Sequence, residues 1–431
     1  MNWESIYRRK VTDVTSALSA IGSGDSVYLG GGAGAPAVLV DGLIERAAEL
    51  RKVQLVHILT FIDAPYVDEK YEGAFRSNSL FIGNNVRKAV QEGRADFTPI
   101  FLSEIPGLFQ KGILPIDVAL IALSPPDEHG FCSFGVEVGT TKPAAESARI
   151  IIAEVNQQMP RTLGDSFIHV SRLTHVVEVD HPLPEAPQGG SSPEHLRIGE
   201  FIAEMIPDGA TLQMGIGSIP DAVLKNLGSH KDLGIHTELF SDGVVSLFEQ
   251  GIITCSRKTF HVGKMVAGFL FGTQKLYNFV DNNPIVELHP TEYVNDPFNI
   301  ALNDNMVAIN AALQVDLTGQ VCADSMGPIL YSGVGGQVDF IRGSARSKGG
   351  LPIIALPSTA KGDSISRISP MLPEGSGVTT TRNDVHYVVT EYGVASLYGK
   401  TIRQRTRELI NIAHPRFRDD LIQAAQKLGY L

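Results

Sequence analysis

The stretch "DGATLQMGIGSIPDAVLKNL", Asp208–Leu227, carries the pattern that decides the fold. A short apolar run leads into Gly215 and Gly217, and Pro220 then opens a segment with helical spacing of its apolar residues. Proline is favoured in the first turn of a helix, because its missing N–H has no partner to lose there. The stretch therefore predicts a strand, a glycine turn and a helix, with exposed N–H groups that suit an anion or an oxyanion.

The same order occurs earlier in the chain, in "GDSVYLGGGAGAPAVLVDGL", Gly24–Leu43. Pro36 aligns with Pro220 at an offset of 184, and Gly31 aligns with Gly215. Further on, "PPDEHGFCSFG" and "QVDLTGQVCADSMG" each run into an Asp-x-x-Gly pattern, which is Asp127/Gly130 in the first and Asp316/Gly319 in the second. These echoes indicate two similar halves with a ligand cleft between them.

Continuous apolar runs alternate with helical patterns along both halves. Such runs suit strands that are covered on both faces, and this predicts an α/β fold of two similar open domains with mostly parallel sheets. The candidate strands are "SVYLGGG", "VQLVHIL", "DVALIALS", "RIIIAEV", "TLQMGIG", "GIHTELFS", "PIVELHP", "MVAINAALQV", "LPIIALP" and "VHYVVTE".

The clearest break in the chain is "DHPLPEAPQGGSSPEH", Asp180–His195, which is rich in proline, glycine and serine. This composition is typical of a linker. It predicts an N-terminal domain of residues 1–185 and a C-terminal domain of residues 194–431, a division that suits a chain of 431 residues.

Composition excludes several classes of function. A net charge of −11 argues against a nucleic-acid or anionic-membrane partner. Three widely spaced cysteines without a CxxC pair argue against a disulfide framework and against a structural zinc site. The N-terminus has no apolar signal region and no run of about 18 apolar residues occurs, so we expect a soluble, cytoplasmic protein.

The sequence has no HExxH, GxSxG or GxGxxG motif, and three chemically suggestive stretches remain. They are "QMGIGSIPDAV" (Gln213–Val223), "SGVGGQVDF" (Ser332–Phe340) and "GIHTELFSDG" (Gly234–Gly243). Each also has an ordinary structural explanation, as a βα turn, a tight turn or a solvated carboxylate. A catalytic role for Glu238 requires that its carboxylate lie in a partly dry site that faces oxyanion donors.

Five motifs together resemble the acetyl-CoA hydrolase/transferase family of class I CoA-transferases, with 4-hydroxybutyrate and butyryl-CoA:acetate CoA-transferases closest in appearance. They are "GIGSIPDAVL", "GIHTELFSDGVVSLFEQG", "LSPPDEHGFCSFGV", "GVGGQVDFIRG" and "TTTRNDVHYVVTEYGVASLYGKT". The resemblance extends over essentially the whole chain. It implies the NagB/RpiA-like CoA-transferase architecture, in which two α/β domains face one another with CoA across their interface.

The resemblance also implies a mechanism. Glu238 would attack an acyl-CoA to form an acyl-glutamyl anhydride and then a glutamyl-CoA thioester, in ping-pong exchange between short-chain acids such as 4-hydroxybutyrate or butyrate and acetate. Asn295 would position the glutamyl carbonyl, and the N–H of Gly336 would stabilise oxyanions. CoA, as substrate, would contact Gln213, Gly215, Ile216, Gly217, Ser218, Ile219, Leu313, Gly335, Gly336 and Lys361.

Further expectations follow for the site and its partners. A glutamate of ordinary pKa is ionised at pH 7 and needs no adjacent base, so His236 is interpreted as structural and is expected to point to the opposite face of the strand. No metal is expected, and the resemblance implies a homodimer or a larger homo-oligomer. Two alternatives stay open: an acyl-CoA hydrolase that uses the same glutamate, and a non-catalytic acyl-CoA-binding protein.

Overall fold

A computed structural model describes residues 2–187 and 189–431 of the chain. The chain forms two compact units, the first from residues up to 186 together with 266–294, the second from residues 187–265 and 295–431. The boundary near residue 186 lies inside the predicted linker. We expected one contiguous second domain over 194–431, but residues 266–294 belong to the first unit. This return was not predictable, because it leaves no change in composition along the sequence.

The first unit contains a seven-stranded sheet whose strands all pair in parallel. Its order is β10 (His175–Val179), β7 (Ile150–Asn156), β5 (Val118–Leu123), β1 (Ser26–Leu29), β2 (Val53–His57), β3 (Phe75–Ser79) and β4 (Asp96–Phe97). The unit also has the helices α1 (Trp3–Lys10), α2 (Val14–Leu18), α3 (Ala37–Glu45), α4 (Asn84–Gln91), α5 (Ile105–Gln110), α6 (Thr141–Ser147), α10 (Gln274–Val280) and α11 (Thr291–Val294). Short strands complete it: β6 (Phe131–Ser133), β8 (Leu163–Gly164), β9 (Phe167–His169), β14 (Val286–Leu288) and most of β13 (Met265–Leu270).

Strand β1 shows why its sequence is apolar without alternation. Val27 and Leu29 belong to the hydrophobic cluster on one face of the sheet, whereas Tyr28 belongs to the cluster that holds Phe109 and Ala144. All three strand residues are at most 1 % exposed. Both faces of the sheet are therefore buried, as expected for a parallel sheet that helices cover on both sides.

The second unit repeats this construction. Its strand order is β25 (Gly393–Ser396), β24 (Tyr387–Thr390), β20 (Leu351–Ala355), β15 (Met306–Ala311), β11 (Thr211–Met214) and β12 (Gly234–Phe240). All of these pairs are parallel except β24 with β25. Each of the ten runs predicted as strands in the two halves contains a strand.

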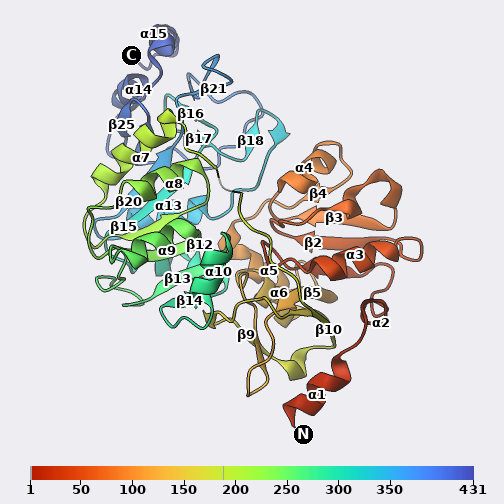
Figure 1. The fold of residues 1–431 in the computed structure, drawn as a ribbon. Coiled ribbons are helices and arrows are strands. Elements are labelled where there is room, and N and C mark those ends of the chain that lie inside the picture. Colours follow the sequence, from red (N-terminus) through yellow and green to blue (C-terminus); the bar gives the residue numbers. More distant parts are fainter. Residues whose placement is uncertain (1, 188) are drawn as a thin grey trace. The chain divides into compact units, whose positions relative to one another are not determined.

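Seven helices accompany this sheet, and all of them except α12 are labelled in Figure 1. They are α7 (Pro193–Met205), α8 (Ser218–Lys225), α9 (Asp242–Glu249), α12 (Pro297–Ala301), α13 (Gln337–Arg346), α14 (Ile402–Asn411) and α15 (Arg418–Lys427). Helix α13 packs on β15 and β20. Short strands lie outside the main sheet: β16 (Gln314–Asp316), β17 (Val321–Cys322), β18 (Ser325–Met326), β19 (Ile329–Leu330), β21 (Thr359–Ala360), β22 (Ile365–Ser366) and β23 (Ile368–Ser369).

The two units share one strand permutation. In the first unit, β1 has β2 on one side and β5, β7 and β10 in turn on the other; in the second, β11 has β12 on one side and β15, β20 and β24 on the other. The first strand of each unit is thus the point at which the strand order reverses. Ligands of open α/β sheets bind at such a point, outside the carboxyl ends of the strands.

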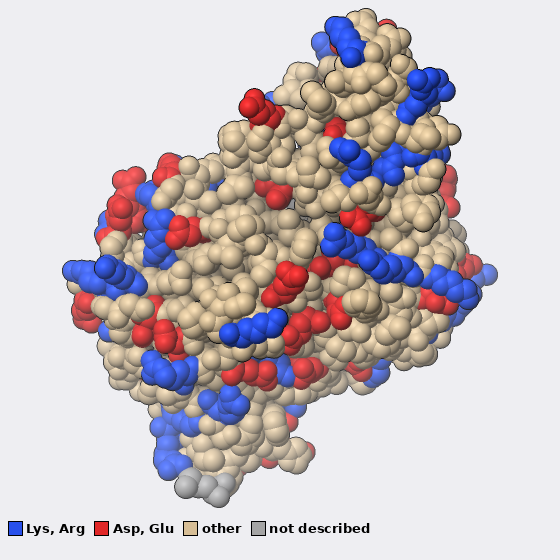
Figure 2. Space-filling model, turned by 180° about the vertical axis from the view of Figure 1, so that it is seen from behind, with Lys and Arg blue, Asp and Glu red and all other residues tan. Residues whose placement is uncertain are grey.

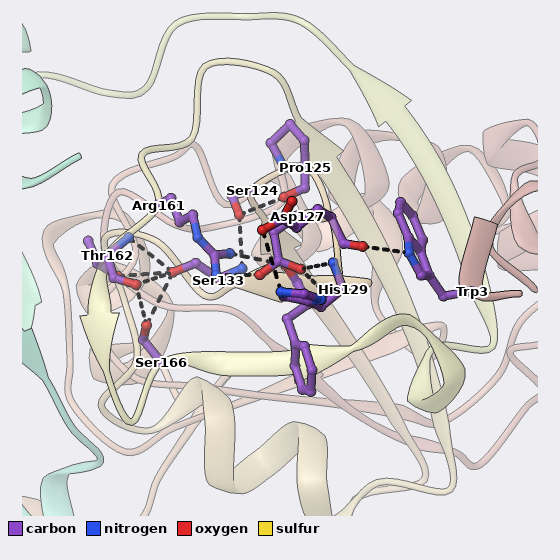
Figure 3. Close-up of polar contacts among 11 residues, drawn as sticks. Trp3, Ser124, Pro125, Asp127, His129, Ser133, Arg161, Thr162 and Ser166 are labelled. Atoms are coloured by element: carbon purple, nitrogen blue, oxygen red, sulfur yellow. Dashed lines mark hydrogen bonds and ion pairs between the residues drawn. The ribbon is translucent and has the colours of Figure 1, made fainter. Parts of the chain in front are cut away.

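The Asp-x-x-Gly echo is also structural. Oδ1 of Asp127 accepts hydrogen bonds from the N–H groups of His129 and Phe131, at 2.9 Å each, and Figure 3 shows this loop. Oδ1 of Asp316 accepts in the same way from Thr318 and Gln320, at 2.9 and 3.0 Å.

The glycines of these two loops match as well. Gly130 has φ of 85° and Gly319 has φ of 92°, in the region that favours glycine. The N–H of each glycine donates to the carbonyl of its aspartate, at 3.0 and 2.9 Å. The two loops lie 189 positions apart, counted from Asp127 to Asp316. They adopt the same turn, which supports internal repetition.

The surface carries charges of both signs. On the face drawn in Figure 2, lysine and arginine side chains are interspersed with aspartate and glutamate side chains. Within the described part of the chain, none of the helices combines the length and the apolar character needed to cross a bilayer.

Candidate active site

Glu238 lies near the carboxyl end of β12, where this strand continues beyond its neighbour β11. The last backbone pair between them joins Leu212 to Ile235. Beyond it, the hydroxyl of Thr237 accepts from the N–H of Met214 at 3.3 Å and donates to its carbonyl at 2.9 Å. Strand β11 then turns away into the glycine stretch, so Glu238 lies beyond the last pair with β11, at the carboxyl end of β12, and remains partly exposed while Thr237 and Leu239 are buried.

The two other predicted catalytic residues, Asn295 and Gly336, meet at this carboxylate. Nδ2 of Asn295 donates to Oε2 of Glu238 at 3.4 Å, and the backbone of Gly336 hydrogen-bonds to the same side chain. A β-carbon added to Gly336 would overlap both Oε2 of Glu238 and Nδ2 of Asn295. Residues 57 and 98 positions after Glu238 in the sequence are thus brought into direct contact with it.

The elements around these residues explain their placement. Asn295 is fully buried and directly precedes Asp296, whose side chain caps α12 by accepting from the N–H of Phe298 at 2.8 Å. Gly336 is the N-cap of α13 and has no side chain to satisfy the first N–H groups of the helix. The N-terminus of α13 therefore offers N–H donors and a partial positive charge next to Glu238.

Burial raises the pKa of Glu238 to about 7, while the hydrogen bond from Asn295 lowers it, the charge of Asp339 raises it and the Gly336 backbone lowers it. The expectation that this glutamate is fully ionised at pH 7 was therefore wrong. Local desolvation outweighs two hydrogen-bond donors, so the protonated form of Glu238 is populated near neutral pH.

His236 is fully buried, with its ring centroid 6.2 Å from that of Phe340 and 6.4 Å from that of Phe260. One hydrogen-bonding contact joins its Nδ1 to Nδ2 of Asn303 at 3.3 Å. Residues two apart on a strand share a face, so the expectation that His236 points away from Glu238's face was wrong. Its aromatic packing supports the structural interpretation of the ring.

The predicted CoA-contacting turn follows β11 directly. Gln213 is buried, and its side chain exchanges two hydrogen bonds with Asn310 of β15, at 3.0 and 3.4 Å. Gly217 has φ of 118° and is the N-cap of α8 without a side-chain cap, while Ile216 is 40 % exposed. Ser218 and Ile219 begin the helix, and space is open around the position of a β-carbon on Gly215.

The remaining predicted contacts are distributed over the same unit. Leu313 is half-buried in the segment that follows β15, and Gly335, with φ of 56°, directly precedes Gly336. Lys361 is exposed, with φ of 51°, in the turn of the β21–β22 hairpin. The structure does not bring Lys361 into the contacts around Glu238.

Sequence reasoning missed three residues next to the site. Asn310 pairs with Gln213, and Gln337 and Thr380 hydrogen-bond to each other at 3.0 Å directly beside Gly336. A signal was present for Gln337, which follows the glycine loop without a gap. Asn310 and Thr380 lie in an apolar strand and a threonine run, which give no such signal.

Comparison with known proteins supports the same class of site. The family model of the acetyl-CoA hydrolase/transferase N-terminal domain matches residues 1–185, and that of the C-terminal domain matches residues 272–425. The 4-hydroxybutyrate coenzyme A transferase of Clostridium kluyveri is 53 % identical over 99 % of this chain and 100 % of its own length.

Two further relatives extend the comparison. The succinyl-CoA:acetate/propanoyl-CoA:succinate CoA transferase of Fasciola hepatica is 51 % identical over 93 % of this chain and 84 % of its own. The crystal structure of RipA from Yersinia pestis superposes with a TM-score of 0.95 at 37 % identity, with both chains fully covered. Sequence and fold together define an enzyme of the CoA-transferase class. The chain belongs to the acetyl-CoA hydrolase/transferase family.

Proposed function

We propose that the enzyme exchanges CoA between short-chain carboxylic acids by covalent catalysis through Glu238. The observation that carries this proposal is the cluster at the carboxyl end of β12, where the Glu238 carboxylate lies between the Asn295 amide and the Gly336 backbone. A carboxylate nucleophile requires such donors, because negative charge develops on the carbonyl oxygen during each attack.

In the first half-reaction, the Glu238 carboxylate attacks the thioester carbonyl of the acyl-CoA donor. A mixed anhydride forms between glutamate and acyl group, and CoA leaves as its thiolate. The thiolate then attacks the glutamyl carbonyl of the anhydride, which releases the acid and leaves glutamyl-CoA thioester on the enzyme. Each step exchanges one acyl bond for another, so the reaction is reversible and splits one difficult transfer into two.

The second half-reaction reverses these steps with another acid. The incoming carboxylate attacks the glutamyl thioester and expels CoA thiolate, and the thiolate then attacks the acyl carbonyl of the new anhydride. The Asn295 amide orients the glutamyl carbonyl, and the N–H of Gly336 donates to the oxyanion at the N-terminus of α13. The turn of residues 213–219, with Leu313, Gly335 and Lys361, binds CoA.

For the acids, we propose 4-hydroxybutyrate or butyrate with acetyl-CoA as partner. The identity of 53 % to a 4-hydroxybutyrate coenzyme A transferase supports this pair. A relative of 51 % identity is named for succinyl-CoA, acetate and propanoyl-CoA, so a panel of acceptor acids against acetyl-CoA, with identification of the CoA esters formed, tests the substrate pair separately from the mechanism.

The mechanism is tested by trapping. Incubation with acetyl-CoA followed by hydroxylamine is expected to convert Glu238 to its hydroxamate, because the glutamyl thioester is electrophilic, and peptide mapping locates the modified residue. Initial-rate lines at varied acceptor should be parallel. Modification of a different residue, or intersecting lines, would contradict the proposal, and CoA release at an equal rate without any acceptor acid would identify a hydrolase.

A further inference from the structure

The side chain of Gln337 spans two elements directly beside Gly336. Its Nε2 donates to the carbonyl of Ala311, the last residue of β15, at 2.7 Å, and its Oε1 accepts from the hydroxyl of Thr380 at 3.0 Å. Gln337 is 7 % exposed and Thr380 is fully buried. The bond to Thr380 is therefore shielded from water, where a hydrogen bond is electrostatically stronger than at the surface, whereas the bond to Ala311 is only partly buried.

Thr380 is itself fixed. Its N–H donates to the carbonyl of Val321 at 3.2 Å and its carbonyl accepts from the N–H of Val321 at 3.1 Å, which forms an antiparallel bridge to β17. Strand β17 pairs in turn with β16, in the hairpin that Asp316 and Gly319 close. Gln337 is thus held on one side by the backbone carbonyl of Ala311 and on the other by the hydroxyl of a threonine whose backbone is bridged to β17.

Gly336 is joined directly to this anchor by its peptide bond to Gln337. Gly336 lies between Gly335, whose φ is 56°, and Gln337. Because Gly336 has no side chain, no side-chain contact of its own holds it in place. On its C-terminal side, the N–H of Phe340 donates to the Gly336 carbonyl at 3.0 Å, as the first turn of α13. The two hydrogen bonds of the Gln337 side chain, which form a fork to Ala311 and Thr380, start at the residue that directly follows Gly336.

We propose that Gln337 and Thr380 are positioning residues for the reaction: their hydrogen bond holds the Gly336 N–H against the Glu238 carboxylate. This inference rests on the proposed function of Glu238 and Gly336. Loss of the bond leaves a buried acceptor on Gln337 unpaired and lets Gly336 move. A misplacement of about 1 Å lowers an enzymatic rate by about 100-fold, so a partial release of the turn has a measurable effect.

The first variant is Thr380→Val, which has nearly the same shape and lacks the hydroxyl donor. We expect kcat to fall about 10-fold while KM for acyl-CoA stays within about twofold, since Thr380 does not contact the substrate. The acid limb of the kcat/KM profile should move to higher pH, because Glu238 loses a donor that favours its charged form. Thr380→Ser restores the donor and should restore both quantities.

The matched control is Thr381→Val at the neighbouring position. The hydroxyl of Thr381 donates to Asp384 at 2.9 Å on the exposed surface, outside the fork. We expect wild-type kcat and a wild-type acid limb for this control. A role of Thr380 in folding alone would lower its melting temperature and leave the acid limb in place, and that result would overturn the inference.

A double-variant cycle gives a second, independent test. Gln337→Met removes both bonds of the fork with little change of volume, and we expect kcat to fall by about 100-fold. Because the two side chains act as one unit, adding Thr380→Val to Gln337→Met should cause no further loss. Losses that multiply would show that the residues act separately. If Thr380→Val does not fold, the KM, kcat and acid limb of Gln337→Met decide the question.

Trapping of the wild-type enzyme separates this inference from the proposed function. If acetyl-CoA and hydroxylamine leave Glu238 unmodified in the wild type, the covalent mechanism fails and the positioning role fails with it. If Glu238 is trapped in the wild type but Thr380→Val keeps the wild-type kcat and acid limb, only the positioning role is wrong.

Discussion

At the scale of single residues, Gly336 is the position at which the site tolerates no side chain. Its φ of −91° suits any residue, so backbone strain does not explain the glycine. The reason is space, because a β-carbon would overlap Glu238 and Asn295. A glycine here keeps the N–H donor of the turn in contact with the carboxylate.

Gly336→Ala is therefore expected to displace the carboxylate or the amide and to lower kcat by about 10²–10³, the range for loss of one oxyanion donor. Steady-state kinetics measure this effect. Gly228→Ala is the control, because space around the position of its β-carbon is open, and it should keep wild-type activity. An active Gly336→Ala enzyme would remove Gly336 from the mechanism.

The pKa of Glu238 predicts a pH dependence. Only the carboxylate is a nucleophile, and its pKa of about 7 means that kcat/KM rises with pH through this value and levels off above it. Asp339→Asn removes a negative charge that raises the pKa and should move the limb to lower pH. Kinetics between about pH 4 and pH 9 locate the acid limb of kcat/KM, and a limb near pH 4.5 would indicate an unperturbed glutamate.

Sequence reasoning named three residues that the structure brings together, and it missed their environment. Glu238, Asn295 and Gly336 occur in motifs whose order resembles the family, and the structure brings the three together. The raised pKa was not predictable, because it depends on burial by residues distant in the sequence. The partnership of Gln337 with Thr380 joins positions 43 apart, and no pattern in the sequence records it.

At the scale of elements, the two glycine turns that look alike in sequence differ in structure. In the first unit, Oε2 of Glu154 on β7 accepts from the N–H groups of Val38 and Leu39 at 3.0 and 3.2 Å and so caps α3. The strand registers place Ile354 of β20 at the equivalent position of the second unit. The N-cap residue of α8 is Gly217, which has no side chain to accept from the first N–H groups of the helix, and the apolar Ile354 cannot accept from them either.

The internal cap predicts a structural role for Glu154. It is 1 % exposed, and its other oxygen lies 2.9 Å from Nε2 of His181. Glu154→Gln replaces one acceptor oxygen by a donor and should lower the free energy of unfolding by about 1–3 kcal/mol. Urea unfolding measures the change. The exposed Glu45 on α3 is the control, and Glu45→Gln should lie within about 0.5 kcal/mol of wild type.

Apolar strands were predictable and polar ones were not. The run "VQLVHIL" gave β2, but its neighbour β3 reads "FRSNS" and has no apolar pattern. Three of these residues, Ser77, Asn78 and Ser79, are buried all the same. The backbone of β3 pairs with the whole length of β2. Two of its polar side chains also find partners, since Oγ of Ser77 lies 2.9 Å from Nε2 of His57 and Oδ1 of Asn78 accepts from the hydroxyl of Thr98 at 2.9 Å, and such contacts depend on tertiary structure.

At the scale of the whole molecule, composition predicted two α/β units but not the path of the chain between them. Residues 266–294 belong to the first unit although they follow the linker. Within this unit lies Glu137, a buried carboxyl group that the proposed mechanism does not use. Its Oε1 accepts from the N–H of Thr140 at 3.1 Å, and its Oε2 accepts from the hydroxyl of Thr141.

Burial raises the pKa of Glu137 from 4.5 to about 7, although hydrogen bonds from Thr140, Gly31 and Thr141 lower it. Between these two values the folded protein keeps a proton that the unfolded chain has released. The free energy of unfolding therefore falls as pH rises, by about 1.4 kcal/mol per unit and about 3 kcal/mol over the window. The stabilisation is complete below pH 4.5 and lost above pH 7.

Glu137→Gln should remove this dependence, because glutamine has the shape of the protonated acid: its carbonyl accepts from the Thr140 N–H, and its amide donates to the Thr141 hydroxyl. Relative to wild type, the variant should therefore gain about 3 kcal/mol between pH 4.5 and pH 7. Urea unfolding at a series of pH values measures the difference, with Glu45→Gln as an exposed control that shows no gain. Parallel pH curves for Glu137→Gln and wild type would mean that Glu137 is ionised in the folded protein.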